Sequence, residues 1–134
     1  MERLMTLAKE AMLNAYAPYS GFWVGAALLC ADGSIYTGCN IENAAYGPTN
    51  CAERTAFFKA VSEGKRSFTA IAICGGKAGE ITDICPPCGV CRQVMREFCS
   101  DDFVIYLLGA GDSVEKHTLS QLLPCSFRGE KCLG

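Results

Sequence analysis

The sequence predicts an α/β protein: a three-layer α/β/α sandwich with a central mixed sheet of about five strands. Apolar residues recur at helical spacing over residues 2–15, which predicts an amphipathic helix at the start of the chain. An Asp-Gly pair at positions 32–33 separates two strand-like runs, which predicts a hairpin. Strand-like runs then alternate with capped helices, and this alternation favours a sheet with helices on both faces.

The first half of the chain is interpreted as a helix, a hairpin and a second helix. The segment AYAPYSG (15–21) breaks the first helix, and the hairpin strands are expected over residues 22–30 and 35–40. Asn50 is a good N-cap residue, so the second helix is expected from about Cys51 to Glu63, just before a glycine.

The second half is interpreted as a strand, a helix, a strand and a short helix. FTAIAIC (68–74) is apolar enough for a buried strand, and a glycine-rich loop leads from it to two prolines. Proline suits a helix start, so a helix is expected from about Cys88 to Cys99. FVIYLL (103–108) predicts a further strand, and residues 119–123 a short helix before a polar tail.

Composition and charge exclude several classes of function. A chain of 134 residues, half of them hydrophobic and 19% charged, is expected to fold as one domain over residues 1–134. The net charge of -2, without a Lys/Arg cluster, argues against nucleic-acid binding. The longest apolar stretch, residues 22–31, is half of a membrane span, and the N-terminus has no apolar signal core. We therefore expect a cytoplasmic protein with no membrane partner.

Ten cysteines in such a chain favour thiols and a metal site over disulfides, although the even number permits full pairing. Cys88 and Cys91 are three apart in the first turn of a predicted helix, so their sulfurs share one face. Cys51 has the equivalent place on the earlier helix. If the two helix starts converge, three thiolates meet one metal ion, and the helix dipoles stabilise their charge.

Three thiolates leave one position of a tetrahedral ion open, which is typical of catalytic zinc. Water in that position loses a proton near neutral pH, and Glu53 is placed to take the proton and return it to a substrate. Side chains in a first helical turn lean toward the N-terminus, so Cys51 and Glu53 can both approach an ion beyond the helix end. Arg54 is expected to donate to the thiolates and offset their charge.

Cys85 leaves two other interpretations open. With Cys88 and Cys91 it resembles part of an iron–sulfur motif, or it is a fourth ligand that closes a structural zinc site. The next cysteine, Cys99, does not have ferredoxin spacing, and the prolines after Cys85 should take its sulfur off the helix face. His117, the single histidine, is expected at the surface. The remaining cysteines are expected to be small buried hydrophobes: residues 30, 39, 74, 99, 125 and 132.

Two motifs carry a resemblance to a known family: Cys51-Ala52-Glu53 and Pro87-Cys88-x-x-Cys91. With both in place, the chain resembles the small zinc-dependent cytidine deaminases of the cytidine/deoxycytidylate deaminase superfamily. FWVGAALL (22–29) and NIENA (40–44) narrow the resemblance to the nucleoside branch. Family-like segments cover nearly the whole chain: residues 15–29, 38–46, 50–64, 88–98 and 122–127.

The resemblance implies hydrolytic deamination of cytidine and 2′-deoxycytidine to uridine and 2′-deoxyuridine, with release of ammonia, in pyrimidine salvage. Cys51, Cys88 and Cys91 would hold one Zn²⁺ per subunit. A zinc-bound hydroxide would attack C4 of the base, and Glu53 would shuttle the protons.

The resemblance also implies contacts with the substrate. Phe22, Asn40 and Glu42 would line the nucleoside pocket, the last two on ribose hydroxyls, because buried polar groups reject ligands that leave them unpaired. Turn chemistry after the hairpin is the alternative for Asn40 and Glu42. Ala52 would offer backbone groups to the base, and Tyr46 would lie near the sugar.

A homotetramer is the assembly that the resemblance implies, with Phe127 covering the base in a neighbouring subunit. The alternative is that Phe127 packs on its own domain. The chain departs from the family pattern at Cys85, at Pro86 and in its cysteine-rich tail. Two other functions remain open: a deaminase of a modified cytosine nucleoside of the antibiotic type, which NIE (40–42) and the Phe127 segment disfavour, and a non-catalytic zinc-stabilised module.

Overall fold

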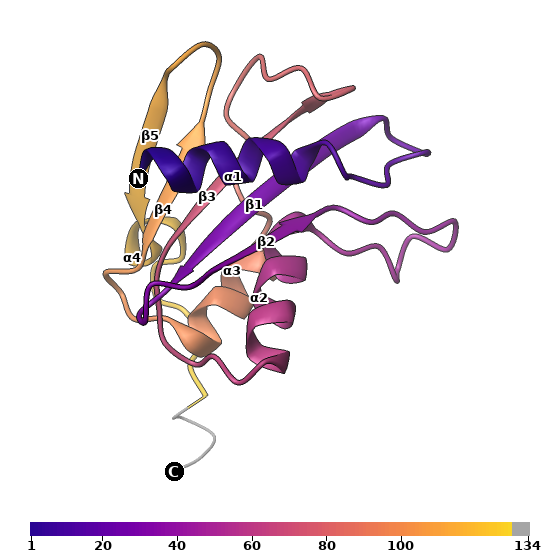
Figure 1. The fold of residues 1–134 in the computed structure, drawn as a ribbon. Coiled ribbons are helices and arrows are strands. Elements are labelled where there is room, and N and C mark those ends of the chain that lie inside the picture. The colour runs from indigo at the N-terminus through magenta and orange to yellow at the C-terminus, as the bar shows by residue number, and fades with distance from the viewer. Residues whose placement is uncertain (130–134) are drawn as a thin grey trace.

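The computed structural model describes residues 1–129, which form one five-stranded sheet between two layers of helices (Figure 1). The strand order is β2-β1-β3-β4-β5; β3 and β4 pair in parallel and the other neighbours are antiparallel. The predicted sandwich with a mixed sheet is confirmed. The elements, in chain order, are α1 (Glu2–Met12), β1 (Phe22–Cys30), β2 (Ile35–Cys39), α2 (Ala52–Ser62), β3 (Phe68–Lys77), α3 (Gly89–Phe98), β4 (Val104–Leu108), β5 (Val114–Thr118) and α4 (Leu119–Leu122).

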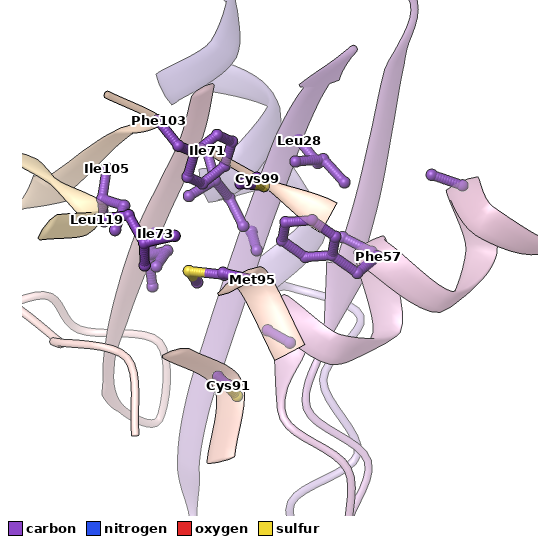
Figure 2. Close-up of a cluster of buried hydrophobic side chains, with 14 of the residues drawn as sticks. Leu28, Phe57, Ile71, Ile73, Cys91, Met95, Cys99, Phe103, Ile105 and Leu119 are labelled. Atoms are coloured by element: carbon purple, nitrogen blue, oxygen red, sulfur yellow. The ribbon is translucent and has the colours of Figure 1, made fainter. Parts of the chain in front are cut away.

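The two faces of the sheet carry side chains of different size, because successive residues of a strand point to opposite faces. Alanines of β1 and β3 face α1, which crosses one side of the sheet (Figure 1). Larger side chains face the other helices: Figure 2 shows Phe57 of α2 and Met95 of α3 in one cluster with Ile73 of β3. Cys91 lies in the same buried cluster, on α3 (Figure 2). The face of the sheet with the larger side chains therefore supports α2 and α3, the helices that begin beside the predicted metal ligands.

Two glycines let helices lie close against the sheet. A Cβ built on Gly25 would lie 2.1 Å from the carbonyl oxygen of Ala8 in α1. A Cβ on Gly38 would lie 2.4 Å from the carbonyl oxygen of Ala52 in α2. Any side chain at these positions would force the helix backbone away from the sheet. The position of α2, and of the residues at its start, therefore depends on Gly38.

Some element ends differ from the sequence predictions. The first helix ends at Met12 rather than at residue 15, and β3 continues to Lys77. The N-cap of α2 is Cys51, so the prediction of Asn50 was wrong. Asn50 instead pairs with Ile41 in an isolated bridge, and its side-chain nitrogen donates to Thr55 Oγ1 at 3.1 Å. The bridge between Asn50 and Ile41 therefore outweighs the local preference of Asn50 for the N-cap position.

The strand β5 could not be located in the sequence. Its five residues, VEKHT, contain a single large apolar side chain, Val114, which is exposed. The strand lies at the edge of the sheet, where charged side chains block pairing with other chains. An edge strand of this kind lacks the apolar run that marks β3 and β4.

The nine cysteines among residues 1–129 are free thiols. Cys125 is exposed, so the prediction that it is buried was wrong: it lies after α4, outside any helix or strand that could cover it. Cys132 lies outside the described residues. His117 is partly exposed and contacts Glu115 Oε1 at 2.9 Å, in line with its predicted surface position. The predicted burial is confirmed for Cys30, Cys74 and Cys99, while Cys39 is only partly buried. No helix within the described range is long and apolar enough to cross a bilayer.

Candidate metal centre

Two helices begin at one place, and each brings cysteine sulfur to it. Cys51 is the N-cap of α2, Cys88 is the N-cap of α3, and Cys91 lies in the first turn of α3. Cys88 Sγ is 3.8 Å from Cys51 Sγ and 3.4 Å from Cys91 Sγ. All three sulfurs lie within 4.8 Å of one another. The predicted convergence of the two helix starts is therefore present.

The spacing of these sulfurs fits a zinc ion. A tetrahedral ion with Zn–S bonds of about 2.3 Å places its ligand sulfurs about 3.8 Å apart. Thiolates are soft ligands of the kind that zinc accepts, and three of them leave a fourth position for another ligand. The backbone N–H of Cys91 donates to Cys88 Sγ at 3.4 Å, which helps to orient that sulfur. The cluster therefore supports zinc as the cofactor.

Cys85 is not part of this cluster. A Cβ on Gly75 would lie 3.1 Å both from Cys85 Sγ and from the ring of Phe22, so this thiol lies beside β3 and β1. Burial, followed by nearby carboxylate and thiol groups, raises the pKa of Cys85 to about 12. Among the described residues, the thiol sulfurs that gather within 4.8 Å of one another are those of Cys51, Cys88 and Cys91. The iron–sulfur and four-sulfur interpretations therefore gain no support from the described residues.

Negative charge in the cluster is partly offset by Arg54. Its Nη2 donates to Cys51 Sγ at 3.2 Å, from three residues further along the chain. Hydrogen bonds from Cys91 and from Arg54 lower the pKa of Cys51 to about 5. The same hydrogen bond with Cys51 raises the pKa of Cys91, and the thiolate raises the pKa of Arg54. The guanidinium therefore stays charged beside the sulfurs.

Glu53 is the one buried carboxylate in the described part of the chain. It is 4% exposed and lies in the first turn of α2, separated from Cys51 by the buried Ala52. Burial raises the pKa of Glu53 to about 7. A carboxyl group with such a pKa can both take up and release a proton near neutral pH, as general acid–base catalysis requires.

A separate hollow of about 350 Å³ contains two of the predicted substrate contacts, Glu42 and Tyr46, and is also lined by Tyr19, Ser20 and Thr49. Three larger hollows, of about 440, 500 and 550 Å³, contain none of the predicted site residues. The hollow of about 350 Å³ is therefore the one that contains predicted substrate contacts.

The side chains of Asn40 and Glu42 make hydrogen bonds to residues that lie far from them in the sequence. Asn40 Oδ1 accepts from the backbone N–H of Val24 at 2.9 Å, and its Nδ2 donates to the carbonyl oxygen of Phe22 at 2.8 Å. Glu42 accepts from residues in the loop before β1. An amide nitrogen has two hydrogens and a carboxylate accepts about four bonds, so each side chain keeps capacity for a ligand.

Three predicted aromatic contacts are exposed. Tyr46 is 74% exposed, Phe127 is 61% exposed and Phe22 is 40% exposed. Tyr46 has a left-handed backbone with φ of 61°, and its ring lies edge-on to that of Tyr19 at 6.5 Å. The exposure of Phe127 gives no support to the alternative that it packs on its own domain.

Sequence reasoning missed two polar residues that follow Cys91 directly. Arg92 donates to the carbonyl oxygens of Pro87, at 2.8 Å, and of Leu122, at 2.6 Å. Gln93 donates to the carbonyl oxygen of Phe127 at 3.0 Å. These bonds link the start of α3 to the segment after α4. Their place next to a metal ligand was the available signal, but the sequence does not say which carbonyl groups they reach.

Comparison with known proteins agrees with this geometry. The family model described as "Cytidine and deoxycytidylate deaminase zinc-binding region" matches residues 1–107. A cytidine deaminase from Sporosarcina psychrophila is 52% identical over 130 residues, 97% of this chain and 93% of that protein. A blasticidin-S deaminase from Bacillus cereus is 32% identical over 108 residues, 78% of this chain and 76% of that protein.

A solved structure shares the whole fold. The crystal structure of a cytidine deaminase from Burkholderia pseudomallei superposes with a TM-score of 0.87 at 45% identity, and covers 94% of this chain and 98% of that chain. The match of the family model, the identity to curated relatives and this superposition lead to one conclusion. The chain belongs to the cytidine and deoxycytidylate deaminase family.

Proposed function

We propose that this protein is a zinc-dependent cytidine deaminase, which converts cytidine and 2′-deoxycytidine to the corresponding uridines and releases ammonia. The observation that carries the proposal is the cluster of Cys51, Cys88 and Cys91 sulfurs within 4.8 Å, with the buried carboxyl of Glu53 two residues from one of them. The names of the relatives support cytidine as the substrate.

Glu53 performs the proton transfers in this proposal. Cys51, Cys88 and Cys91 would hold the zinc ion, which when bound would lower the pKa of a water molecule. Glu53 would take one proton from the attacking water and deliver it to N3 of the base. It would then take the proton of the new hydroxyl on C4 and deliver it to the departing amino group, so that one water is consumed and one ammonia leaves. A carboxyl pKa of about 7 suits both directions of transfer.

Arg54 tunes the same step through the thiolates. Three thiolates on one divalent ion leave a net negative cluster, which makes a bound water a weaker acid. The guanidinium at 3.2 Å from Cys51 Sγ withdraws part of that charge. The two helix N-termini act in the same direction.

The sugar is held by Asn40 and Glu42. One N–H of Asn40 and one acceptor position of Glu42 are left after their bonds to the backbone and to Ser20. A hydroxyl can accept from the first and donate to the second. Ribose and 2′-deoxyribose both offer such a hydroxyl at C3′, so both nucleosides are expected as substrates. Phe22 and Tyr46 supply apolar walls, and Ala52 supplies backbone groups to the base.

We extend the proposal to a cytoplasmic homotetramer with one catalytic unit per chain. The exposed ring of Phe127, 61% accessible in the isolated chain, supports a role in covering a neighbouring site. The nine free thiols among residues 1–129 suit a reducing compartment.

Ammonia release from several substrates tests the proposal. The purified protein is assayed with cytidine, 2′-deoxycytidine, free cytosine, blasticidin S and single-stranded RNA, and uridine is identified by chromatography. Turnover of the two simple nucleosides, lost with a chelator and restored by zinc, is the expected result. Preferred turnover of blasticidin S would point to the antibiotic type, and bound zinc without turnover of any substrate to a structural module.

A further inference from the structure

Ser20 joins two of the residues proposed for the sugar subsite. Its hydroxyl donates to Glu42 Oε2 and accepts from the backbone N–H of Phe22 at 3.0 Å. The backbone N–H groups of Ser20 and of Tyr19 both donate to Glu42 Oε1 at 3.0 Å. Lys77 Nζ holds the carbonyl oxygen of Ser20 at 2.6 Å, so the loop is also tied to the end of β3.

These contacts fix the direction in which Glu42 can accept a further hydrogen bond. A carboxylate accepts about four hydrogen bonds, two on each oxygen. The two backbone donors fill Oε1, and the hydroxyl of Ser20 fills one of the two positions on Oε2. One acceptor position on Oε2 is left. The hydroxyl of Ser20 also lowers the pKa of Glu42, so the group stays a charged acceptor.

Backbone hydrogen bonds also hold the shape of this loop. Gly21 N donates to the carbonyl oxygen of Ala17 at 2.9 Å, and Ala78 N donates to the carbonyl oxygen of Gly21 at 2.8 Å. The bonds of Tyr19 and Ser20 to Oε1 of Glu42 are also backbone bonds. The hydroxyl of Ser20 adds two contacts to these bonds: it donates to Oε2 of Glu42 and accepts from the backbone N–H of Phe22 at the start of β1.

We propose that Ser20 is a positioning residue for recognition of the sugar: its hydroxyl aims the last acceptor position of Glu42 at a nucleoside hydroxyl. The inference rests on the proposed function and adds to it a residue outside the expected set of substrate contacts. Within the described residues, the hydrogen bonds of Ser20 go to Glu42, Phe22 and Lys77 rather than to the metal ligands. Ser20 should therefore affect the binding of substrate and of transition state equally, which changes KM and leaves kcat nearly unchanged.

Two variants remove the strong donor and one keeps it. Ser20→Ala deletes the hydroxyl, and Ser20→Cys keeps a group of similar size that is only a weak donor. Ser20→Thr retains the hydroxyl. Ser34→Ala is the matched control, because the hydroxyl of Ser34 donates to Asp32 Oδ1 at 2.6 Å in the hairpin turn, a similar contact away from the proposed sugar subsite.

Steady-state kinetics with cytidine and 3′-deoxycytidine give the decisive readout. Ser20→Ala and Ser20→Cys are expected to raise KM for cytidine about tenfold, as the loss of one charge-assisted hydrogen bond predicts, with kcat within about twofold. The KM for 3′-deoxycytidine should not change. Ser20→Thr and Ser34→Ala should behave like the parent protein, and all variants should retain zinc.

An unchanged KM for cytidine in both Ser20→Ala and Ser20→Cys would overturn the assignment. So would an equal rise with 3′-deoxycytidine, or the same rise in Ser34→Ala, because either result indicates a general effect on the loop or the fold. Failure of the proposed function is seen separately, in the parent protein, as absence of turnover. In that event calorimetric binding of uridine to the parent and to Ser20→Ala still decides the inference: a tenfold loss of affinity supports it, and equal affinity contradicts it.

Discussion

Replacement of Gly38 by alanine tests how strictly the position of α2 determines the metal centre. A Cβ at this position lies 2.4 Å from the carbonyl oxygen of Ala52 and 2.6 Å from the backbone nitrogen of Ala56. Ordinary contacts begin at 3.4 Å, so the helix must retreat by about 1 Å. Both atoms belong to the backbone, and no side-chain rotation can relieve the overlap.

The displacement has two measurable consequences. Forced overpacking of this kind costs about 1–3 kcal/mol of the free energy of unfolding. It also moves Cys51 and Glu53, at the start of α2, relative to Cys88 and Cys91 on α3. A misplacement of about 1 Å at a catalytic group lowers the rate by about 100-fold. Thermal unfolding, zinc content and kcat for cytidine should therefore all fall in Gly38→Ala.

Gly89→Ala is the matched control for this experiment. Gly89 is the first residue of α3, next to the ligand Cys88, and a Cβ there would meet no atom within 4 Å. This variant should keep the stability and the kcat of the parent protein. Stability and activity equal to those of the parent protein in Gly38→Ala would show that the position of α2 does not depend on its close contact with β2.

Three further predictions follow from the site. Arg54→Gln should lower kcat about tenfold and move the acidic limb of the pH–rate profile to higher pH, because the cation that favours deprotonation of the attacking water is lost. An unchanged pH–rate profile would show that Arg54 is only a surface charge. Phe127→Ala should raise KM for cytidine with zinc content unchanged, and Gln93→Ala should do so to a smaller extent; full activity of a demonstrated monomer would contradict a shared site. In zinc-stripped protein, Glu53→Gln should stabilise the fold at pH 8 by up to about 3 kcal/mol and have little effect below pH 4.5. The pKa of Glu53 is about 7 in the folded state and 4.5 ordinarily, so the parent protein loses stability as the pH rises from 4.5 to 7. An equal gain in stability at both pH values would show that burial of the charge is not the cause.

The metal centre could be predicted from the sequence because its geometry is mostly local. Cys88 and Cys91 share a helix start, and their spacing alone places both sulfurs on one face. Cys51 required one further assumption, that two helix starts converge, and the three sulfurs confirm it. The role of Arg54 as a donor to Cys51 follows from a separation of three residues on one helix.

The sugar side could not be derived in the same way. The bonds of Asn40 to β1 and of Glu42 to Ser20 depend on which loops approach one another, and no local pattern encodes this. The resemblance to a family identified Asn40 and Glu42 but not Ser20. Strand β5 was missed because an edge strand needs little apolar character. The predicted N-cap of α2 was wrong because Asn50 forms a bridge to Ile41.

The central claim is that Glu53 transfers protons at a zinc site that it does not itself ligate. The most direct test measures zinc content and uridine formation on the same samples of the parent protein and of Glu53→Gln. We expect about one zinc ion per chain in both, and a loss of turnover of about 10²–10⁴-fold in the variant. Loss of zinc in step with activity would show that Glu53 is a ligand, and full turnover would show that another group moves the protons; either result would contradict the account.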